Sequence, residues 1–232
     1  MITLRPTNER GRASHGWLEA RHTFSFAGYF DPEHMGFRDL RVLNEDRIAP
    51  GAGFPEHPHR DMEILTWVLS GGLRHSDDMG NGSVIRPGDI QRMSAGTGVV
   101  HSEFNASDSA PTHLLQIWIE PRSKGIEPGY EEAHFAPERL ADRLCLVASR
   151  DGREDSVRVH QDLELFVADL GPGVSVRHEL EPGRHAWLQV AAGELELAGR
   201  TMRAGDGAAV SGERALELRG TVDGQVLLFD LP

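Results

Sequence analysis

Two pairs of side chains in this sequence have the spacing of metal ligands. His57 and His59 are separated by one residue, and His101 and Glu103 repeat that spacing further along the chain. Residues two positions apart on a β-strand project from the same face, so each pair directs both side chains to one point. Two such strands facing each other inside a small barrel would bring together three imidazoles and one carboxylate. That set of donors suits a divalent transition metal, and the sequence therefore predicts a metal site.

The residues that precede and follow the pairs support this prediction. Gly51-Ala-Gly53 turns the chain into the first pair, and Gly96-Thr-Gly98 turns it into the second. An apolar run, residues 64–69, follows the first pair. A single histidine among the 12 of this chain would more often be a surface or hydrogen-bonded residue. The conjunction of two same-face pairs, each beside a glycine-rich turn, favours the metal site over that alternative.

The composition is that of a folded protein that does not bind nucleic acid directly. Of the 232 residues, 39% are hydrophobic and 26% are charged, which is the ordinary globular range. The 36 acidic and 24 basic residues give a net charge of -12, which repels phosphate backbones. The sequence shows neither a signal-peptide core nor an apolar stretch that could span a membrane. Cys145 is the single cysteine and excludes an intramolecular disulfide, so we expect a cytoplasmic protein.

Short apolar runs separated by Gly, Pro, Asn and Asp predict an all-β sandwich or barrel. Helical spacing is nearly absent, and the best helix candidate is the short segment 137–144, where Pro137 could occupy a first turn. The expected strands contain residues 40–43, 64–69, 114–119, 144–148, 163–167, 187–190 and 226–229.

An internal similarity indicates two tandem barrels. Arg86-Pro-Gly-Asp89 follows an apolar strand and a turn in the first half, and Arg203-Ala-Gly-Asp206 has the same setting in the second. We therefore expect an N-terminal metal-binding domain over residues 1–132 and a C-terminal domain over residues 133–232. Aligning the two halves places no His-x-His pair and no His-x-Glu pair in the second. Its remaining histidines are scattered, at His160, His178 and His185, and we expect a C-terminal domain without a metal site.

The two ligand pairs lie in segments that resemble the two cupin motifs. His57-Pro-His-Arg-Asp-Met-Glu63 resembles the first motif, and Gly98-Val-Val-His-Ser-Glu-Phe-Asn105 resembles the second. More specifically, the chain resembles the pirin family of two-cupin proteins over about residues 15–120. The blocks that carry this resemblance include residues 22–26, 29–32, 35–37, 40–46, 75–81 and 93–96. The resemblance implies two cupin barrels, each a double-stranded β-helix.

The resemblance also bears on which carboxylate binds the metal. In the general cupin pattern the acidic ligand follows the His-x-His pair, a position matched here by Glu63. The pirin family places it two residues after the last histidine, which implies that Glu103 is the ligand. Glu63 then becomes a structural acid, or one hydrogen-bonded beside the site.

The pirin resemblance implies non-haem iron(II), with Mn, Cu, Ni, Co and Zn as alternatives, and oxidative ring opening of the flavonol quercetin with loss of carbon monoxide. Deprotonating the flavonol 3-hydroxyl makes the ring electron-rich, and Glu103 is placed to accept that proton provided that it leaves or weakens its bond to the metal, which would make it both ligand and base. The substrate would need an apolar cleft. Candidates for its lining, each also compatible with a core position, are Phe24, Phe26, Phe37 and Met93.

Two other classes of function remain open from the sequence. Eukaryotic pirins resemble these blocks and are implicated as iron-bound partners of transcription regulators, so the chain could be a redox-responsive protein-binding module. A metal-stabilised scaffold with a closed site is the third alternative. For the enzyme we expect a flavonol-like substrate and dioxygen as partners, no nucleic acid, no membrane, and a monomer.

Overall fold

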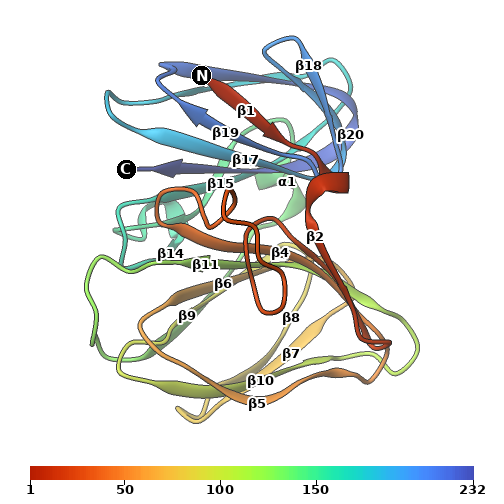
Figure 1. The fold of residues 1–232 in the computed structure, drawn as a ribbon, viewed down its shortest axis with the longest axis vertical. Helices are drawn as coiled ribbons and strands as arrows, with labels where there is room; N and C mark the ends of the chain where they lie inside the picture. The colour runs from red at the N-terminus through yellow and green to blue at the C-terminus, as the bar shows by residue number, and fades with distance from the viewer. The chain divides into compact units, whose positions relative to one another are not determined.

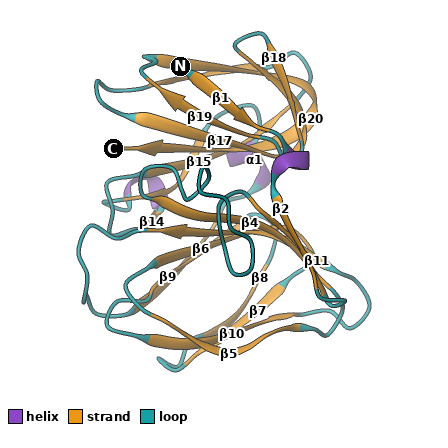
Figure 2. Ribbon diagram, in the orientation of Figure 1, coloured by secondary structure: helices purple, strands orange, loops and turns teal.

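The computed structural model describes residues 1–232 and confirms the all-β prediction (Figures 1 and 2). Its one α-helix, α1 (Pro137–Leu140), is shorter than the predicted helix 137–144 because Ala141 is extended and Asp142 has φ +57°. Two single turns of 3₁₀ helix lie at Thr7–Glu9 and Arg153–Asp155. All seven apolar runs expected to form strands lie in strands or begin one residue before them.

The chain forms two compact units. The N-terminal unit contains Gly11–His134 together with Val157–Gln161, and the C-terminal unit contains Met1–Arg10, Phe135–Ser156 and Asp162–Pro232. A single cut at residue 132, as expected from the sequence, differs from this division in two segments. The first residues pair with the C-terminal sheet, where Ile2 lies opposite Val210. Residues 157–161 return to the N-terminal unit, where the Arg158 N–H donates to Glu131.

The N-terminal unit is a barrel made of two antiparallel sheets. One sheet has the order β12-β9-β6-β11-β4-β3-β2, and the other has the order β5-β10-β7-β8. Apolar side chains from both sheets, among them Leu114 on β11 and Leu73 on β7, form a buried cluster between them. The strands of the two sheets are β2 (Gly11–Ser14), β3 (Leu18–His22), β4 (Leu40–Ile48), β5 (Gly53–His59), β6 (Glu63–Ser70), β7 (Leu73–Asp77), β8 (Gly82–Ile85), β9 (Asp89–Ser94), β10 (Val99–Asn105), β11 (Thr112–Ile119) and β12 (Gly129–His134). The short strand β14 (Val157–Arg158) also falls in this unit but belongs to neither of its two sheets.

The C-terminal unit has a larger apolar core, drawn from nearly all of its strands. Its sheet follows the order β1-β19-β17-β20-β15-β13, with β16 beside β20 and β18 beside β17. The long strands β17 and β20 carry register shifts, which bend them as a barrel wall requires. The strands are β1 (Ile2–Arg5), β13 (Cys145–Ser149), β15 (Glu164–Leu170), β16 (Ser175–Glu179), β17 (His185–Leu197), β18 (Arg200–Arg203), β19 (Gly207–Ser211) and β20 (Ala215–Leu231).

The internal similarity seen in the sequence corresponds to a repeated turn. Gly88 and Gly205 have φ values of 90° and 88°, a region that favours glycine. The carboxylate of the following aspartate accepts a hydrogen bond from the backbone N–H three residues earlier, from Arg86 at 2.7 Å and from Arg203 at 2.8 Å. Each unit therefore uses the same Gly-Asp turn to connect two of its strands.

Candidate metal centre

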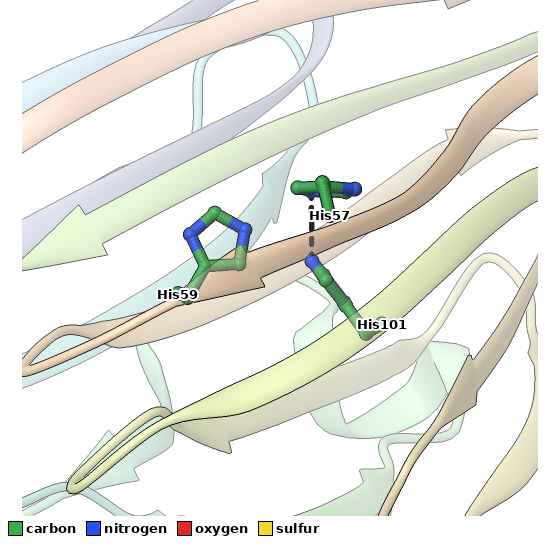
Figure 3. A group of neighbouring side chains, drawn as sticks. All are labelled: His57, His59 and His101. Carbon is green, nitrogen blue, oxygen red and sulfur yellow. Dashed lines mark hydrogen bonds between the residues drawn. The ribbon is translucent and has the colours of Figure 1, made fainter.

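Three imidazoles converge between neighbouring strands of the N-terminal barrel. Strands β5 and β10 are antiparallel, with His101 opposite His57 and Val99 opposite His59. The ligand atoms of His57, His59 and His101 lie within 4.8 Å of one another, and Figure 3 shows the two β5 rings beside the β10 ring. The Nε2 atoms of His57 and His101 are 3.0 Å apart. The i, i+2 spacing thus places both β5 histidines on the face that His101 shares.

A backbone contact fixes the protonation pattern of His57. Its Nδ1 lies 2.8 Å from the carbonyl oxygen of Pro55. A carbonyl only accepts, so Nδ1 of His57 carries a proton, and Nε2 is the ring nitrogen that faces His101. A carbonyl partner on the outer nitrogen is the usual way a ligating histidine is oriented.

The surroundings keep two of the imidazoles neutral. Burial, together with repulsion from His57, lowers the pKa of His59 to about 4. Burial and repulsion from the neighbouring imidazoles lower the pKa of His101 to about 2. Neutral imidazole is the form that binds a metal. At neutral pH both rings are therefore ready to act as ligands.

Glu103 lies on the same strand as His101 but in a different group of side chains. In the β10–β5 pairing a register shift between His101 and Glu103 places Glu103 opposite Phe54, and in the regular β10–β7 pairing Glu103 is opposite His75. The ligand atoms of Glu103, His101 and His75 lie within 4.8 Å of one another. His101 is thus common to the group of three imidazoles and to the group that contains Glu103.

The Glu103 carboxylate is buried with one oxygen unpaired. Gln116 on β11 donates a hydrogen bond of 2.8 Å from Nε2 to Oε2 of Glu103, whereas Oε1 has no partner. Burial raises the pKa of Glu103, although the hydrogen bond from Gln116 opposes this. A cation next to Oε1 would compensate for the lost hydration of the charged form.

These donors fit a transition-metal ion. Two nitrogens about 2.1 Å from one ion are about 3.0 Å apart when they subtend a right angle, which matches the Nε2 separation of His57 and His101. Oε1 of Glu103 is a further anionic donor beside His101, in the second group of ligand atoms rather than in the group of His57 and His59. Imidazole with carboxylate is a donor set found with iron, nickel, copper, manganese and zinc.

Glu63, the carboxylate of the general cupin pattern, makes different contacts. It begins strand β6 and is fully buried. Its Oε2 accepts hydrogen bonds of 2.9 Å from the Ser94 hydroxyl and 3.1 Å from the His160 N–H. The His160 ring is also 3.3 Å from this oxygen. Glu63 therefore attaches the returning segment 157–161 to strands β6 and β9.

A pocket with aromatic side chains in its lining lies beside Trp118, a residue that contacts one of the three imidazoles; none of the three lines the pocket. Trp118 on β11 packs edge to face on the His59 ring, with centroids 4.9 Å apart, and lines a cavity of about 290 Å³. Phe26 contacts Trp118 at 5.3 Å and lines the same cavity. The other lining residues are Ser25, Ala27, Tyr29, Phe30, Met35, Arg41, Val42 and Met62.

Of the four lining candidates named from the sequence, only Phe26 lines this cavity. Phe24 is 2% exposed and belongs to the core. Met93 is buried in a cluster against which Met62 and Trp118 pack. Phe37 forms an isolated β-bridge with Leu40. The sequence did not identify Trp118, although it lies in one of the predicted strands.

His75 and Asp77 lie beside His101 and Glu103, and the sequence predictions assign them no role. They have the same i, i+2 spacing as the two ligand pairs, on β7 beside β10. Their side chains are 0% exposed, and His75 Nε2 lies 3.1 Å from Asp77 Oδ2. The spacing rule that identified the other pairs would have identified this pair as well.

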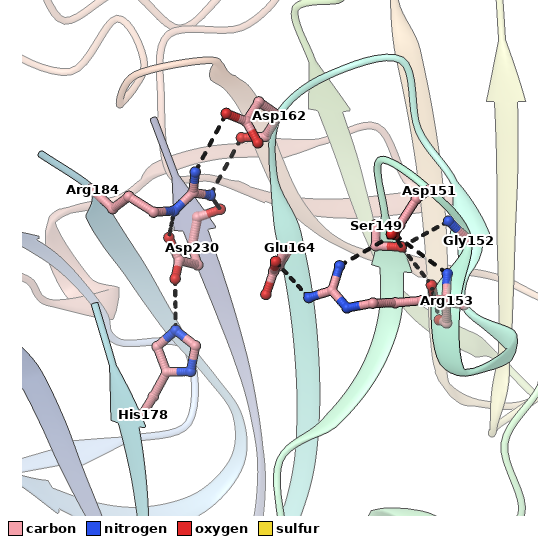
Figure 4. Close-up of polar contacts among 10 residues, drawn as sticks. Ser149, Asp151, Gly152, Arg153, Asp162, Glu164, His178, Arg184 and Asp230 are labelled. Atoms are coloured by element: carbon pink, nitrogen blue, oxygen red, sulfur yellow. Dashed lines mark hydrogen bonds and ion pairs between the residues drawn. The ribbon is translucent and has the colours of Figure 1, made fainter. Parts of the chain in front are cut away.

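The histidines assigned to the C-terminal half from the sequence have separate partners. His178 Nε2 donates a hydrogen bond of 2.7 Å to Oδ2 of Asp230, and Arg184 donates one to the other oxygen, Oδ1 (Figure 4). His185 Nδ1 lies 2.8 Å from the Ser211 hydroxyl. His160 belongs to the N-terminal unit.

Comparisons with known proteins agree with this architecture. The Pirin family model matches residues 3–119, and the model of the quercetinase C-terminal cupin domain matches residues 146–231. Quercetin 2,3-dioxygenase of Escherichia coli K12 is 47% identical over 232 residues, which cover 100% of this chain and 99% of that protein. A Pseudomonas aeruginosa protein named as a putative quercetin 2,3-dioxygenase is 43% identical and matches over the full length of both chains.

A solved structure shows the same family similarity. The crystal structure of the bacterial pirin YhhW from E. coli in complex with nickel(II) is 47% identical, with a TM-score of 0.95, and the match covers 100% of this chain and 99% of that one. No helix of the present structure is long and apolar enough to cross a membrane. The chain belongs to the pirin family of two-cupin proteins, in the bacterial branch that includes the E. coli quercetin 2,3-dioxygenase.

Proposed function

We propose that this protein is a metal-dependent dioxygenase that opens the ring of quercetin-like flavonols with dioxygen and releases carbon monoxide. One observation carries the proposal: the imidazole group touches, through Trp118, an aromatic pocket large enough to hold part of a flavonol. The names of the E. coli and P. aeruginosa relatives support the same substrate class.

In this proposal one metal ion is bound by His57, His59, His101 and Glu103. Iron(II) is the ion we favour, and the nickel(II) complex of the related E. coli pirin supports a site that accepts several transition metals. When bound, the ion would supply a Lewis acid for the flavonol 3-hydroxyl and 4-keto oxygens and a position for dioxygen. Nδ1 of His57 donates to the Pro55 carbonyl, so Nε2 is the nitrogen that would face the ion.

Glu103 is the general base in this scheme. Oε1, the proposed ligand atom, would take the proton of the 3-hydroxyl once its bond to the ion is weakened or broken, because Oε2 is already held by Gln116. Burial raises the pKa of Glu103 from its ordinary value, which brings the carboxylate closer to the basicity that proton transfer at neutral pH requires. Gln116 keeps the carboxylate plane fixed while the proton moves.

The pocket residues orient the substrate and exclude water. Phe26 and Trp118 present ring edges and faces to a planar flavonol, and Met62 closes one side. Arg41 is the one cation among the lining residues. Its Nη1 donates a hydrogen bond of 3.0 Å to the Ser25 carbonyl. Its other N–H groups are suited to a phenolic oxygen of the substrate.

The test is turnover with defined metals. Metal-free protein is loaded separately with iron(II), manganese, cobalt, nickel or copper, and oxygen uptake and carbon monoxide release are measured with quercetin. We expect both in at least one metal form, and loss of both together with the metal in His101→Ala. Stoichiometric metal binding without oxygen uptake on any flavonol would contradict the enzyme and favour a metal-dependent protein-binding regulator.

A further inference from the structure

A bulge in strand β4 brings two consecutive residues to the cavity beside Trp118. Trp118 and Ile119 are neighbours on β11. They lie opposite Val42 and Leu40 on β4, so the residue between these two, Arg41, has no partner on β11. Consecutive side chains of a regular strand point to opposite faces, whereas Arg41 and Val42 both line the cavity of about 290 Å³. A β-bulge re-aims a side chain in this way, and such bulges are common beside active sites.

The Arg41 guanidinium is held in place by a fixed backbone carbonyl. Its Nη1 donates a hydrogen bond of 3.0 Å to the carbonyl oxygen of Ser25. Ser25 is itself fixed, because its N–H donates to the His34 carbonyl at 2.7 Å. The Ser25 hydroxyl also donates to the carbonyl of Asp31 at 2.9 Å and accepts from the N–H of Asp31 at 2.8 Å. The Ser25 carbonyl takes one N–H donor of the guanidinium, which has further donors to offer a ligand.

Arg41 brings the only charge to the lining of the cavity. The other lining residues are neutral, and none is acidic. Asp31, which shares Ser25 with Arg41, directs Oδ2 at two other partners: His34 Nδ1 at 2.8 Å and the Tyr29 hydroxyl at 3.1 Å. The chain as a whole has a net charge of -12 and repels anions. A cavity with aromatic walls, one guanidinium and no carboxylate is a local exception that suits a flat aromatic anion.

We infer that Arg41 is the specificity-determining residue of this cavity, which selects planar aromatic ligands that carry an anionic oxygen, a phenolate or a carboxylate. The preference for an anion needs only the cavity, whereas its use on a flavonol rests on the proposed function. In quercetin the 7-hydroxyl is acidic because it is conjugated with the 4-keto group, and it lies on the side of the fused rings remote from the 3-hydroxyl. Its phenolate is the oxygen that Arg41 would bind.

The first measurement compares the equilibrium binding of two probes of the same shape, naphthalene-2-carboxylate and naphthalene-2-carboxamide. We expect the wild-type protein to bind the carboxylate about tenfold more tightly, between the strength of an exposed ion pair and that of a buried hydrogen bond to a charged group. Arg41→Met keeps a long unbranched side chain and should bind the two probes equally. Arg41→Lys keeps the charge without the planar fork and should retain part of the preference.

The matched control is Arg47→Met, which removes a cation from the same strand. Arg47 is 55% exposed, its Nη2 lies 4.0 Å from Glu45 Oε1, and it does not line the cavity. This variant should keep the wild-type preference. Each protein is measured with and without bound metal. A carboxylate bound by the ion would lose its advantage on metal removal and keep it in Arg41→Met, which separates the ion from the guanidinium.

The second measurement compares KM for quercetin with KM for its 7-methyl ether, which cannot form the 7-phenolate. We expect KM of the ether to be about tenfold higher in the wild type, and the two KM values to be equal in Arg41→Met. An effect of Arg41 on the naphthalene probes without an effect of the 7-methyl group would assign the cavity to aromatic carboxylates and count against quercetin as the substrate.

The inference would be overturned by a wild-type protein that binds the two naphthalene probes equally or binds neither. A carboxylate preference that survives in Arg41→Met, or is lost equally in Arg47→Met, would overturn it as well. Absence of turnover with both flavonols would instead contradict the proposed dioxygenase, and the binding of the naphthalene probes would still decide the role of Arg41.

Discussion

Gln116 donates a hydrogen bond of 2.8 Å to one oxygen of Glu103 and leaves the other oxygen buried without a partner. The two residues come from different sheets of the barrel, β11 and β10. Gln116 thus holds the carboxylate in one orientation and leaves Oε1 as the oxygen to which the proposed function assigns metal binding and proton transfer.

Replacing Glu103 with Gln tests the proposed base. The amide oxygen of the introduced glutamine can face the site only if the Gln116 amide also flips and presents its oxygen to the new NH2 group. An amide cannot accept the substrate proton. We expect part of the metal to be retained and the rate per bound metal to fall by about 100- to 10,000-fold. Oxygen uptake normalised to metal content measures this. Turnover at the wild-type rate per metal would restrict Glu103 to the role of ligand.

Glu63→Gln distinguishes the two candidate carboxylates. Glu63 binds Ser94 and the His160 N–H, so its replacement should leave metal content unchanged. Weakening hydrogen bonds to a buried carboxylate should reduce the free energy of unfolding by about 1–3 kcal/mol. Metal analysis and denaturant unfolding check the two expectations. Loss of metal with unchanged stability would assign the ligand role to Glu63.

The pocket can be tested by replacing two phenylalanines, Phe26, which lines it, and Phe24, which is buried in the core. Phe26→Ala removes a ring that lines the cavity and contacts Trp118, and we expect KM for quercetin to rise roughly two- to twelvefold, as the loss of a ring contact worth about 0.5–1.5 kcal/mol implies. Phe24→Ala should instead cost about 3–5 kcal/mol of stability and leave KM unchanged, because Phe24 is 2% exposed. Similar KM values for Phe26→Ala and wild type would place the substrate elsewhere.

The metal-free protein should lose stability as the pH falls below about 6.5. The pKa values of His59 and His101 are about 4 and about 2 in the folded chain, below the ordinary value of 6.5. Between these values the unfolded chain binds more protons than the folded one, so the free energy of unfolding rises with pH and levels off above about 6.5. Urea unfolding at about pH 5 and about pH 7.5 measures this difference. His101→Ala should reduce it, and an unchanged pH dependence in that variant would contradict the assignment.

The C-terminal unit is predicted to contribute stability without binding the metal. His178 and His185 are engaged with Asp230 and Ser211, so their joint replacement by Gln should leave metal content unchanged. Adding His160→Gln extends the test to the segment that contacts Glu63. Metal analysis of the triple variant is the measurement. A decrease in bound metal per chain would show that these histidines take part in binding.

Much of the architecture follows from local patterns in the sequence. Strand runs, the repeated Gly-Asp turn and the two i, i+2 pairs are short-range features, and each was interpreted correctly as β-structure because side chains alternate along a strand. The convergence of His57, His59 and His101 required only that β5 and β10 be neighbours. The pirin resemblance supplied the preference for Glu103 over Glu63.

Other features depend on contacts that the sequence pattern does not contain. Phe24 and Phe26 have the same spacing as a ligand pair, yet one is in the core and the other lines the pocket, because residues 23–29 form a loop and not a strand. The length of the helix at Pro137 was overestimated because the positive φ of Asp142 cannot be inferred from composition. The return of residues 157–161 to the N-terminal unit is a long-range event with no local signal.

Strand β1 is made first but has its partner near the other end of the chain, where Ile2 lies opposite Val210 on β19. During translation this strand must remain unpaired while about 200 further residues are added, which takes roughly 10–40 s at about 5–20 residues per second. The N-terminal barrel, by contrast, needs only residues up to Gln161. On the ribosome the N-terminal barrel, which contains the proposed metal site, can therefore fold before the C-terminal unit has closed.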